Sequence, residues 1–393
     1  MSSTPEQDAT PYVPAAVMAH NPVLGEGGSW HGLPVHFGWP SAEQEAYEEG
    51  RGLAFLGPIG VVRVTGPDRL SWLTTLSSQV VSDLEPGVSK ELLILDPQGR
   101  VDFAAGVIDD GESAWLLTEP QFAVSLAEYL QSMKFMLRVE IADVSGDYVG
   151  FGTVGAGPAE DFAGSLLWDD PWPGVAAGGA AYFQGTHPGG RTPLRVFAVP
   201  VQGADAFVEA QLRALAGAGE SAMVGLIAAD ATRIAAWRPR ASHEVDDRTL
   251  PAELDWLRTA VHTDKGCYRG QESVARIINL GKPPRRLVFL QLDGSGAELP
   301  ESGDAVELDG RKVGVVTSVG QHFEMGPIAL ALVKRNLDPT VQLKIGEVDA
   351  AQEIIVPVDG RSDHAPASRP GVGLKRLDPG KRDIRTTGPG AGR

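Results

Sequence analysis

Apolar positions change their spacing repeatedly through the first part of the chain. Continuous or alternating apolar runs predict strands at residues 61–64, 91–95, 101–108, 114–118, 148–154 and 194–201. Apolar residues three and four apart predict helices at residues 120–136, 204–215 and 223–237, and after a turn at 65–68. Strands and helices alternate without strict βαβ order, which is typical of an α+β fold with helices on one face of each sheet.

Two turn signals refine this pattern. Asp96-Pro97-Gln98-Gly99 joins two of the expected strands as a hairpin, and Asp309-Gly310 is typical of a type I′ hairpin turn. After Pro284 the pattern changes to closely spaced strands, at residues 287–292, 305–308, 312–319, 328–333, 341–345 and 353–358. This spacing predicts a small barrel or sandwich and a domain boundary near Pro284.

One segment combines a glycine turn with the start of a helix. Gly270 permits a close backbone approach or a positive φ. From Gln271 the pattern becomes helical, because Val274, Ile277 and Ile278 share one face. We therefore expect a helix that begins directly after Gly270.

The only cysteine of the chain, Cys267, lies just before this expected helix, between Lys265 and Arg269. A helix N-terminus and neighbouring cations favour the thiolate, which is the reactive form of cysteine. The same groups suit an anionic ligand, and Glu272 fits the first helical turn. The alternative is a small buried hydrophobic Cys267 with solvated neighbours.

Composition restricts the classes of function. One cysteine in 393 residues excludes a disulfide framework and a cluster or zinc site held by four cysteines of one chain. A net charge of -17 makes nucleic acid a poor partner. No apolar run reaches the length of a membrane span and residues 1–30 lack a signal-peptide pattern, so we expect a cytoplasmic protein that does not bind membranes.

Residues 265–272, Lys-Gly-Cys-Tyr-Arg-Gly-Gln-Glu, are similar to the K-G-C-Y-x-G-Q-E signature of YgfZ-type proteins in the glycine-cleavage T-protein superfamily. Residues 63–68, 250–253 and 314–318 resemble other segments of that superfamily. The likeness covers about residues 38–358. It implies a ring of three domains around a folate-sized hole, with two α+β domains and a C-terminal β-barrel.

Composition predicts a disordered tail rich in Pro, Gly and Ser at 1–35 and a disordered basic tail at 359–393. Between the tails we expect a first α+β region at 36–145, a second at 146–284 and a barrel at 285–358. Members of the family bind tetrahydrofolate or a derivative and support the maturation or repair of iron–sulfur enzymes. The implied partners are folate and either iron–sulfur client enzymes or assembly proteins.

The resemblance gives the motif residues their expected roles. Cys267 would act as the thiolate, and Lys265 and Arg269 would hold negative charge. Tyr268 would contact the folate, and Gln271 with Glu272 would order the loop and the helix start.

Two departures from the aminomethyltransferase pattern concern carboxylates. Those enzymes carry paired Asp residues on a strand, where this chain has Asp102 followed by Phe103. Adjacent strand residues face opposite sides, so either Asp102 faces the ligand as a catalytic carboxylate, or Phe103 does and the carboxylate is lost, which is the favoured alternative. An exposed Asp102 with no site role is equally open.

The second departure is Ala235, which stands where the enzymes have a Glu that binds the pterin. Trp237 offers a stacking face for a pterin, although packing in the core is the favoured alternative. The candidate replacements for the missing carboxylate are Glu244, Asp246, Asp247 and Glu253. His243 and its acidic neighbours lack an HExxH spacing, so no metal site is expected.

Three functions remain open from the sequence. The first is a tetrahydrofolate-binding auxiliary protein for iron–sulfur enzymes that acts through Cys267. The second is a folate-dependent aminomethyl- or methyltransferase that uses Asp102. The third is an interaction scaffold with a vestigial folate site.

Overall fold

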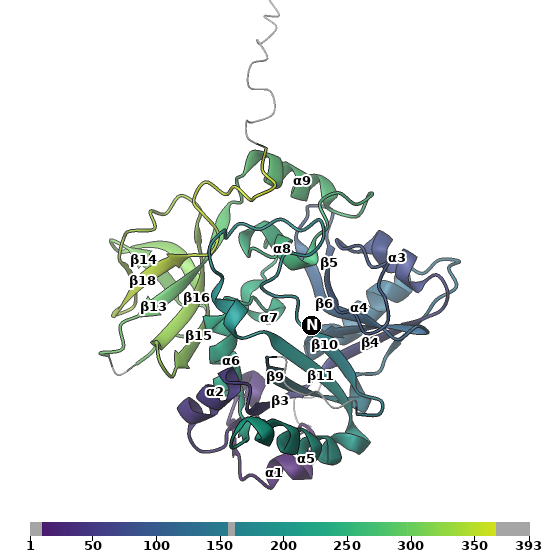
Figure 1. The fold of residues 1–393 in the computed structure, drawn as a ribbon. Helices are drawn as coiled ribbons and strands as arrows, with labels where there is room; N and C mark the ends of the chain where they lie inside the picture. The colour runs from purple at the N-terminus through teal and green to yellow at the C-terminus, as the bar shows by residue number, and fades with distance from the viewer. Residues whose placement is uncertain (1–9, 156–161, 297, 367–393) are drawn as a thin grey trace, which may run out of the picture.

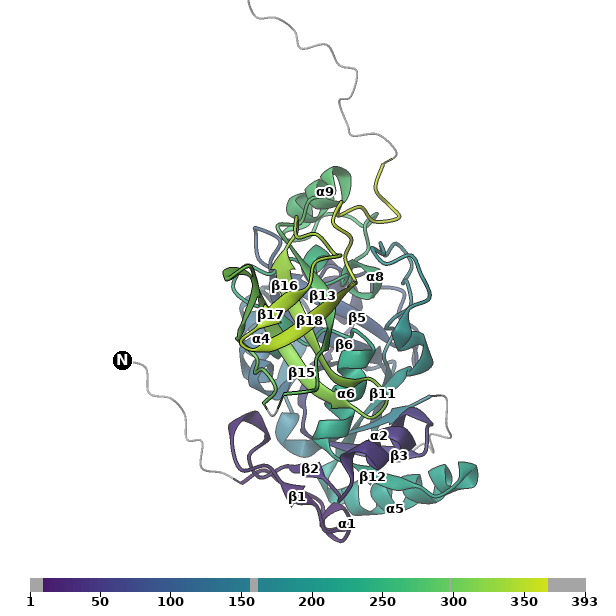
Figure 2. The ribbon, with the colours of Figure 1, turned by 90° about the vertical axis from the view of Figure 1, so that its left-hand side faces the viewer.

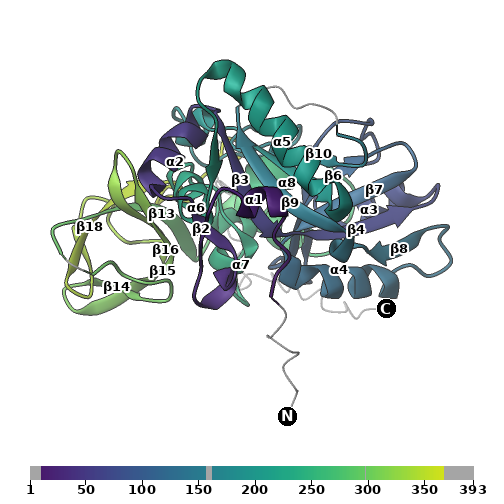
Figure 3. The same cartoon turned by 90° about the horizontal axis from the view of Figure 1, so that it is seen from below.

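The computed structural model describes residues 10–155, 162–296 and 298–366. Three sheet units surround a common centre (Figure 1), and the fold is α+β with a closed C-terminal barrel. Viewed from below, the barrel and the first unit lie on opposite sides of the second unit (Figure 3).

The first unit is an antiparallel sheet with helices on one face. Its strand order is β5 (Lys90–Leu95), β6 (Val101–Asp109), β7 (Ser113–Thr118), β4 (Gly60–Thr65) and β8 (Glu140–Asp143). The covering helices are α3 (Arg69–Leu76) and α4 (Pro120–Ser132). Because Ala123, Leu126 and Leu130 recur at helical spacing, α4 buries one stripe against the sheet.

The strands of the second unit come from chain segments that precede and follow the first unit in the sequence. Its order is β10 (Leu166–Asp169), β11 (Leu194–Pro200), β9 (Tyr148–Val154), β3 (Gly52–Pro58) and β12 (Ala222–Val224). Since β3 pairs with β9 and β12, residues 52–58 belong to this sheet and not to a continuous first region beginning at residue 36. The associated helices are α2 (Pro40–Glu48), α5 (Ala204–Leu215) and α6 (Leu226–Ala235).

The N-terminal segment is ordered from residue 10, which differs from the tail expected over 1–35. It forms α1 (Ala15–Met18), β1 (Val23–Leu24) and β2 (Pro34–His36). Val17 is fully buried in the core of the second unit, and the Ala16 amide donates to the Asp205 carboxylate at 2.7 Å. Residues 1–9 and 367–393 of the two expected tails lie outside the described residues.

The helix expected over 223–237 is divided in the structure into β12 and α6. Gly225 separates them, and a Cβ at this position would lie 2.3 Å from the Val35 carbonyl oxygen. The chain therefore changes from strand to helix where another backbone passes too close for a side chain.

The C-terminal unit is a closed barrel, which decides between barrel and sandwich. The strands are β13 (Arg285–Leu292), β14 (Ala305–Leu308), β15 (Arg311–His322), β16 (Gly326–Lys334), β17 (Leu343–Ile345) and β18 (Val348–Ile354). Asp309 and Gly310 have φ values of 51° and 71°, as a type I′ turn requires.

The three units meet around the largest apolar cluster. It combines Leu93 and Leu95 of β5, Trp237 after α6, Trp256, and Phe289 of the barrel. The connecting segment supplies α7 (Ala241–Glu244), α8 (Leu257–Ala260) and α9 (Gln271–Leu280). Figure 2 places α9 at one end of the molecule and α1, α2 and α5 at the other.

Candidate functional site

The motif segment 265–272 is anchored to the first unit by Lys265. Its ammonium donates to the carbonyls of Ser77 at 2.5 Å and Gln79 at 3.0 Å, and also to the Thr74 carbonyl. These carbonyls lie at the C-terminal end of α3, where the helix dipole favours a cation. Burial lowers the pKa of Lys265 to about 8. Lys265 therefore holds the loop in place, which differs from the expected role of binding negative charge on a ligand.

Two glycines bring the motif against the β5–β6 hairpin. Gly99 and Gly270 both have left-handed backbones, with φ of 81° and 82°. A Cβ on Gly270 would lie 2.6 Å from the Asp96 carbonyl oxygen, and one on Gly99 would lie 2.7 Å from the Ser273 Cβ. The start of α9 thus packs directly on the hairpin turn, as the signal at Gly270 indicates.

This contact brings Arg269 to Asp102. Arg269 Nη1 lies 3.8 Å from Asp102 Oδ2, and both side chains are about two-fifths exposed, at 41% and 37%. Burial raises the pKa of Asp102, and the Arg269 cation opposes that shift. Asp102, the candidate catalytic carboxylate, and Arg269, which was expected to hold negative charge, therefore form an ion pair between the hairpin and the motif.

A β-bulge explains how Asp102 is directed. Ile94 pairs with Phe103 and Leu95 pairs with Val101, so Asp102 is the extra residue on β6. Phe103 packs on the helical side, with its ring 5.8 Å from that of Tyr129. Phe103 therefore does not replace the carboxylate toward the motif, contrary to the favoured sequence interpretation. Bulges commonly redirect side chains beside active sites.

The remaining motif residues flank the cysteine in sequence. Cys267 is exposed. The Lys265 ammonium lies 4.9 Å from the centre of the Tyr268 ring, and Tyr268 packs on the central cluster. Burial raises the pKa of Tyr268. Gln271 Nε2 donates to the Lys265 carbonyl at 3.4 Å, and Glu272 is exposed in the first turn of α9. The sulfur is therefore exposed on a loop whose neighbouring residues Lys265, Tyr268 and Gln271 contact one another.

Glu253, a folate candidate from the sequence, lies away from solvent. It is 0% exposed, and its carboxylate accepts from the Leu250 amide at 3.1 Å and from Arg285 Nη2 at 2.8 Å. Arg285 begins the barrel and also reaches Asp246, with Nη1 to Oδ2 at 2.6 Å. Both oxygens of Glu253 accept hydrogen bonds, so Glu253 links the segment that carries the motif to the barrel.

Trp237 also lies in the interior. It is 5% exposed and has a φ of 56°. Its ring meets those of Phe183 at 5.0 Å, His187 at 5.2 Å and Phe289 at 6.2 Å. This is the core position that the sequence favoured over a stacking face.

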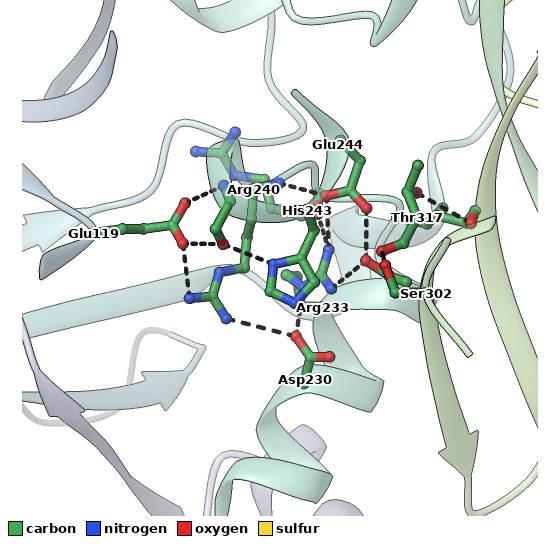
Figure 4. Close-up of polar contacts among 12 residues, drawn as sticks. Glu119, Asp230, Arg233, Arg240, His243, Glu244, Ser302 and Thr317 are labelled. Carbon is green, nitrogen blue, oxygen red and sulfur yellow. Dashed lines mark hydrogen bonds and ion pairs between the residues drawn. The ribbon is translucent and has the colours of Figure 1, made fainter. Parts of the chain in front are cut away.

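A polar network that sequence reasoning missed joins the three units (Figure 4). Glu119, at the start of α4, binds Ser242 and Arg240. Arg233 pairs with Asp230 and Glu244, at 2.7 and 3.2 Å. Glu244 then accepts from Ser318 of the barrel at 2.6 Å. The segment 243–247 therefore contributes to structure, and the described residues contain no cluster suited to a metal.

A second group of buried ion pairs lies where the largest apolar cluster meets β5. Arg238 pairs with Glu91 at 2.6 Å and with Asp170 at 2.8 Å. Burial raises the pKa of Asp170, and Arg238 opposes that shift. Buried donors without a partner in the described residues remain nearby, namely Arg238 Nη1, Trp256 Nε1, Tyr182 Oη and His187 Nε2. The centre therefore keeps unused hydrogen-bonding capacity.

Comparison with known proteins defines the family. Residues 285–369 match the glycine cleavage T-protein C-terminal barrel domain. The aminomethyltransferase of Geobacillus kaustophilus is 31% identical over 337 residues, covering 79% of this chain and 86% of that protein. The chain belongs to the glycine-cleavage T-protein family. The superfamily expected from the motif is therefore confirmed.

A solved structure and a second sequence relative add to this comparison. The aminomethyltransferase T structure from Bartonella henselae matches with a TM-score of 0.68 at 16% identity, covering 87% of this chain and 96% of that one. It shows the shared fold. A tRNA-modifying protein YgfZ of Aliivibrio fischeri is 36% identical over 114 residues, 28% of this chain and 35% of that protein. Within the described residues, no helix is long and apolar enough to cross a membrane.

Proposed function

We propose that this protein is a tetrahydrofolate-binding auxiliary protein that supports iron–sulfur enzymes through Cys267. The observation that carries the proposal is the exposed sulfur on a loop fixed from both sides. Lys265 holds the loop to the end of α3, and Arg269 meets Asp102. A thiol on a fixed, exposed loop can approach a cluster or its iron in a partner protein, as a thiolate ligand does.

The central donors fit a folate. A pterin offers ring nitrogens and a carbonyl as acceptors, and buried donors without partners are costly unless a ligand or water satisfies them. Trp256 Nε1 and Arg238 Nη1 are such donors, and the Arg238 guanidinium carbon lies 5.8 Å from the centre of the Trp256 ring. These residues would hold the pterin. The folate would supply one-carbon chemistry when bound.

The auxiliary role follows from what the site lacks. Ala235 stands where the transferases have a pterin-binding Glu, and Glu253 is fully engaged by the barrel. The chain has one cysteine, so a conventional cluster has to reside in a partner. The name of the YgfZ relatives connects them with tRNA modification, and the net charge of -17 favours a protein partner over direct contact with tRNA.

A second candidate is folate-dependent aminomethyl transfer. The observation in its favour is that Asp102 points toward the motif loop while Phe103 packs under α4. A carboxylate at that position can orient the reacting nitrogen and stabilise developing positive charge. Its pairing with Arg269 weakens this candidate, because the nearby cation offsets part of the carboxylate charge.

Two assays separate these functions. Calorimetric titration with 5-formyltetrahydrofolate should show binding, and absence of heat at high micromolar ligand would contradict both candidates. Turnover with an aminomethyl-lipoyl protein should be undetectable. Turnover that is lost in Asp102→Asn but retained in Asp96→Asn would contradict the auxiliary role and support aminomethyl transfer.

A further inference from the structure

A shallow hollow of about 260 Å³ lies on the second unit, remote from the motif. Figure 2 shows α2 and β12, which supply part of its wall, side by side. Its wall is formed by His20, Phe37, Trp39, Ala42, Glu43, Ser221, Ala222 and Met223. None of these residues takes part in the proposed function.

Aromatic rings form one side of the hollow. The His20 and Phe37 rings meet edge to face at 6.5 Å between centroids. Trp39 is 81% exposed, and its indole has no ring partner within the described parts of the chain. An exposed indole between β2 and α2 leaves its negative face free for a cation.

A buried carboxylate forms the other side. Glu43 is 6% exposed and accepts from the Phe37 amide at 2.7 Å and from the Gly225 amide at 3.0 Å. Within the described residues it forms no ion pair, and Arg51, the nearest cation in sequence, is engaged by Glu49. Buried carboxylates are usually paired with a cation. The two amides orient the carboxylate, and the helix start stabilises its charge without cancelling it.

We propose that this hollow binds a methylated ammonium group. Aromatic faces attract such cations through their quadrupole, and the unpaired Glu43 supplies the opposite charge. The volume is below that of pockets for whole drug-sized ligands, which begin near about 300 Å³, and so suits a head group. The ammonium belongs either to a free small molecule or to a methylated lysine side chain.

The test compares choline with its neutral isostere, 3,3-dimethyl-1-butanol, by saturation-transfer NMR on the full chain. Choline should bind at least about fivefold more tightly than the isostere, and Trp39→Ala should weaken choline binding by about fivefold or more. Phe135→Ala is the matched control, since that ring is 83% exposed in the first unit. Its choline affinity should be unchanged.

Equal binding of the isostere, or unchanged choline binding in Trp39→Ala, would overturn the proposal. Glu43→Gln removes the charge but leaves one of the two backbone amides without its acceptor, so thermal unfolding first establishes that the variant is folded. The folded variant should lose the preference for choline. A trimethyllysine peptide distinguishes the sources. Tighter binding of the peptide than of choline assigns the ammonium to a protein partner, and the reverse assigns it to a free molecule. Both outcomes support the site and are independent of the result with folate.

Discussion

The Cα of Gly99 lies 2.8 Å from the point that a Cβ on Gly270 would occupy. Gly99 lies in the β5–β6 hairpin and Gly270 lies directly before α9, and both lack a side chain, so the hairpin turn and the start of α9 can touch. The contact brings Asp102 to Arg269, which lies two residues after Cys267 in the motif.

We expect Gly270→Ala to destabilise the protein by about 2 kcal/mol or more, because the left-handed backbone and the hairpin both exclude a Cβ. Urea unfolding measures this change. Gly266→Ala is the matched control in the same motif, with no atom within 4 Å of its added Cβ. Equal stability of the two variants would show that the close approach is not required.

His187 should make stability depend on pH. Burial lowers the pKa of His187 to about 3, below its ordinary 6.5. Between these values the unfolded chain binds the proton and the native protein does not, so stability is complete above pH 6.5 and falls as the pH drops toward 3.

The variant His187→Asn isolates this effect, because Asn keeps an acceptor for the Gly189 amide but has no titrating proton. Thermal unfolding at pH 7 and pH 5 should show a larger loss of stability in the parent protein than in the variant. If both proteins lost the same stability between pH 7 and pH 5, the imidazole would be exposed to water and not buried among the aromatic rings.

Glu253→Gln should destabilise the protein by about 2 kcal/mol, since it removes the buried charge that faces Arg285 and leaves Asp246 as its ionic partner. Chemical unfolding measures the change, and Asp247→Asn is the control because its side chain is 87% exposed. In the double variant with Arg285→Met, the loss should be smaller than the sum of the two single losses. Strict additivity would mean that the pair contributes no coupling.

Local features of the fold could be predicted from the sequence. The helix after Gly270, the hairpin at 96–99 and the type I′ turn at Asp309 depend on residues that are close in the chain, so spacing and turn chemistry indicate them directly. The exposed position of Cys267 follows the same logic, because it lies in the loop before a helix.

Long-range packing could not be predicted in this way. The place of β3 in the second sheet depends on pairing with β9 and β12, roughly a hundred or more positions away, and no local pattern encodes it. Glu253 and Lys265 are ligand candidates in the sequence, but in the structure Arg285 and the Gln79 carbonyl engage them. The direction of Asp102 depends on a bulge, which a strand pattern does not reveal.

The central claim concerns the sulfur of Cys267, and the most direct measurement is functional rescue of cells that lack this factor, read as the activity of an iron–sulfur enzyme. Cys267→Ala should fold and bind 5-formyltetrahydrofolate like the parent protein but fail to rescue, whereas the neighbouring Gly266→Ala should rescue. Full rescue by Cys267→Ala would contradict the account.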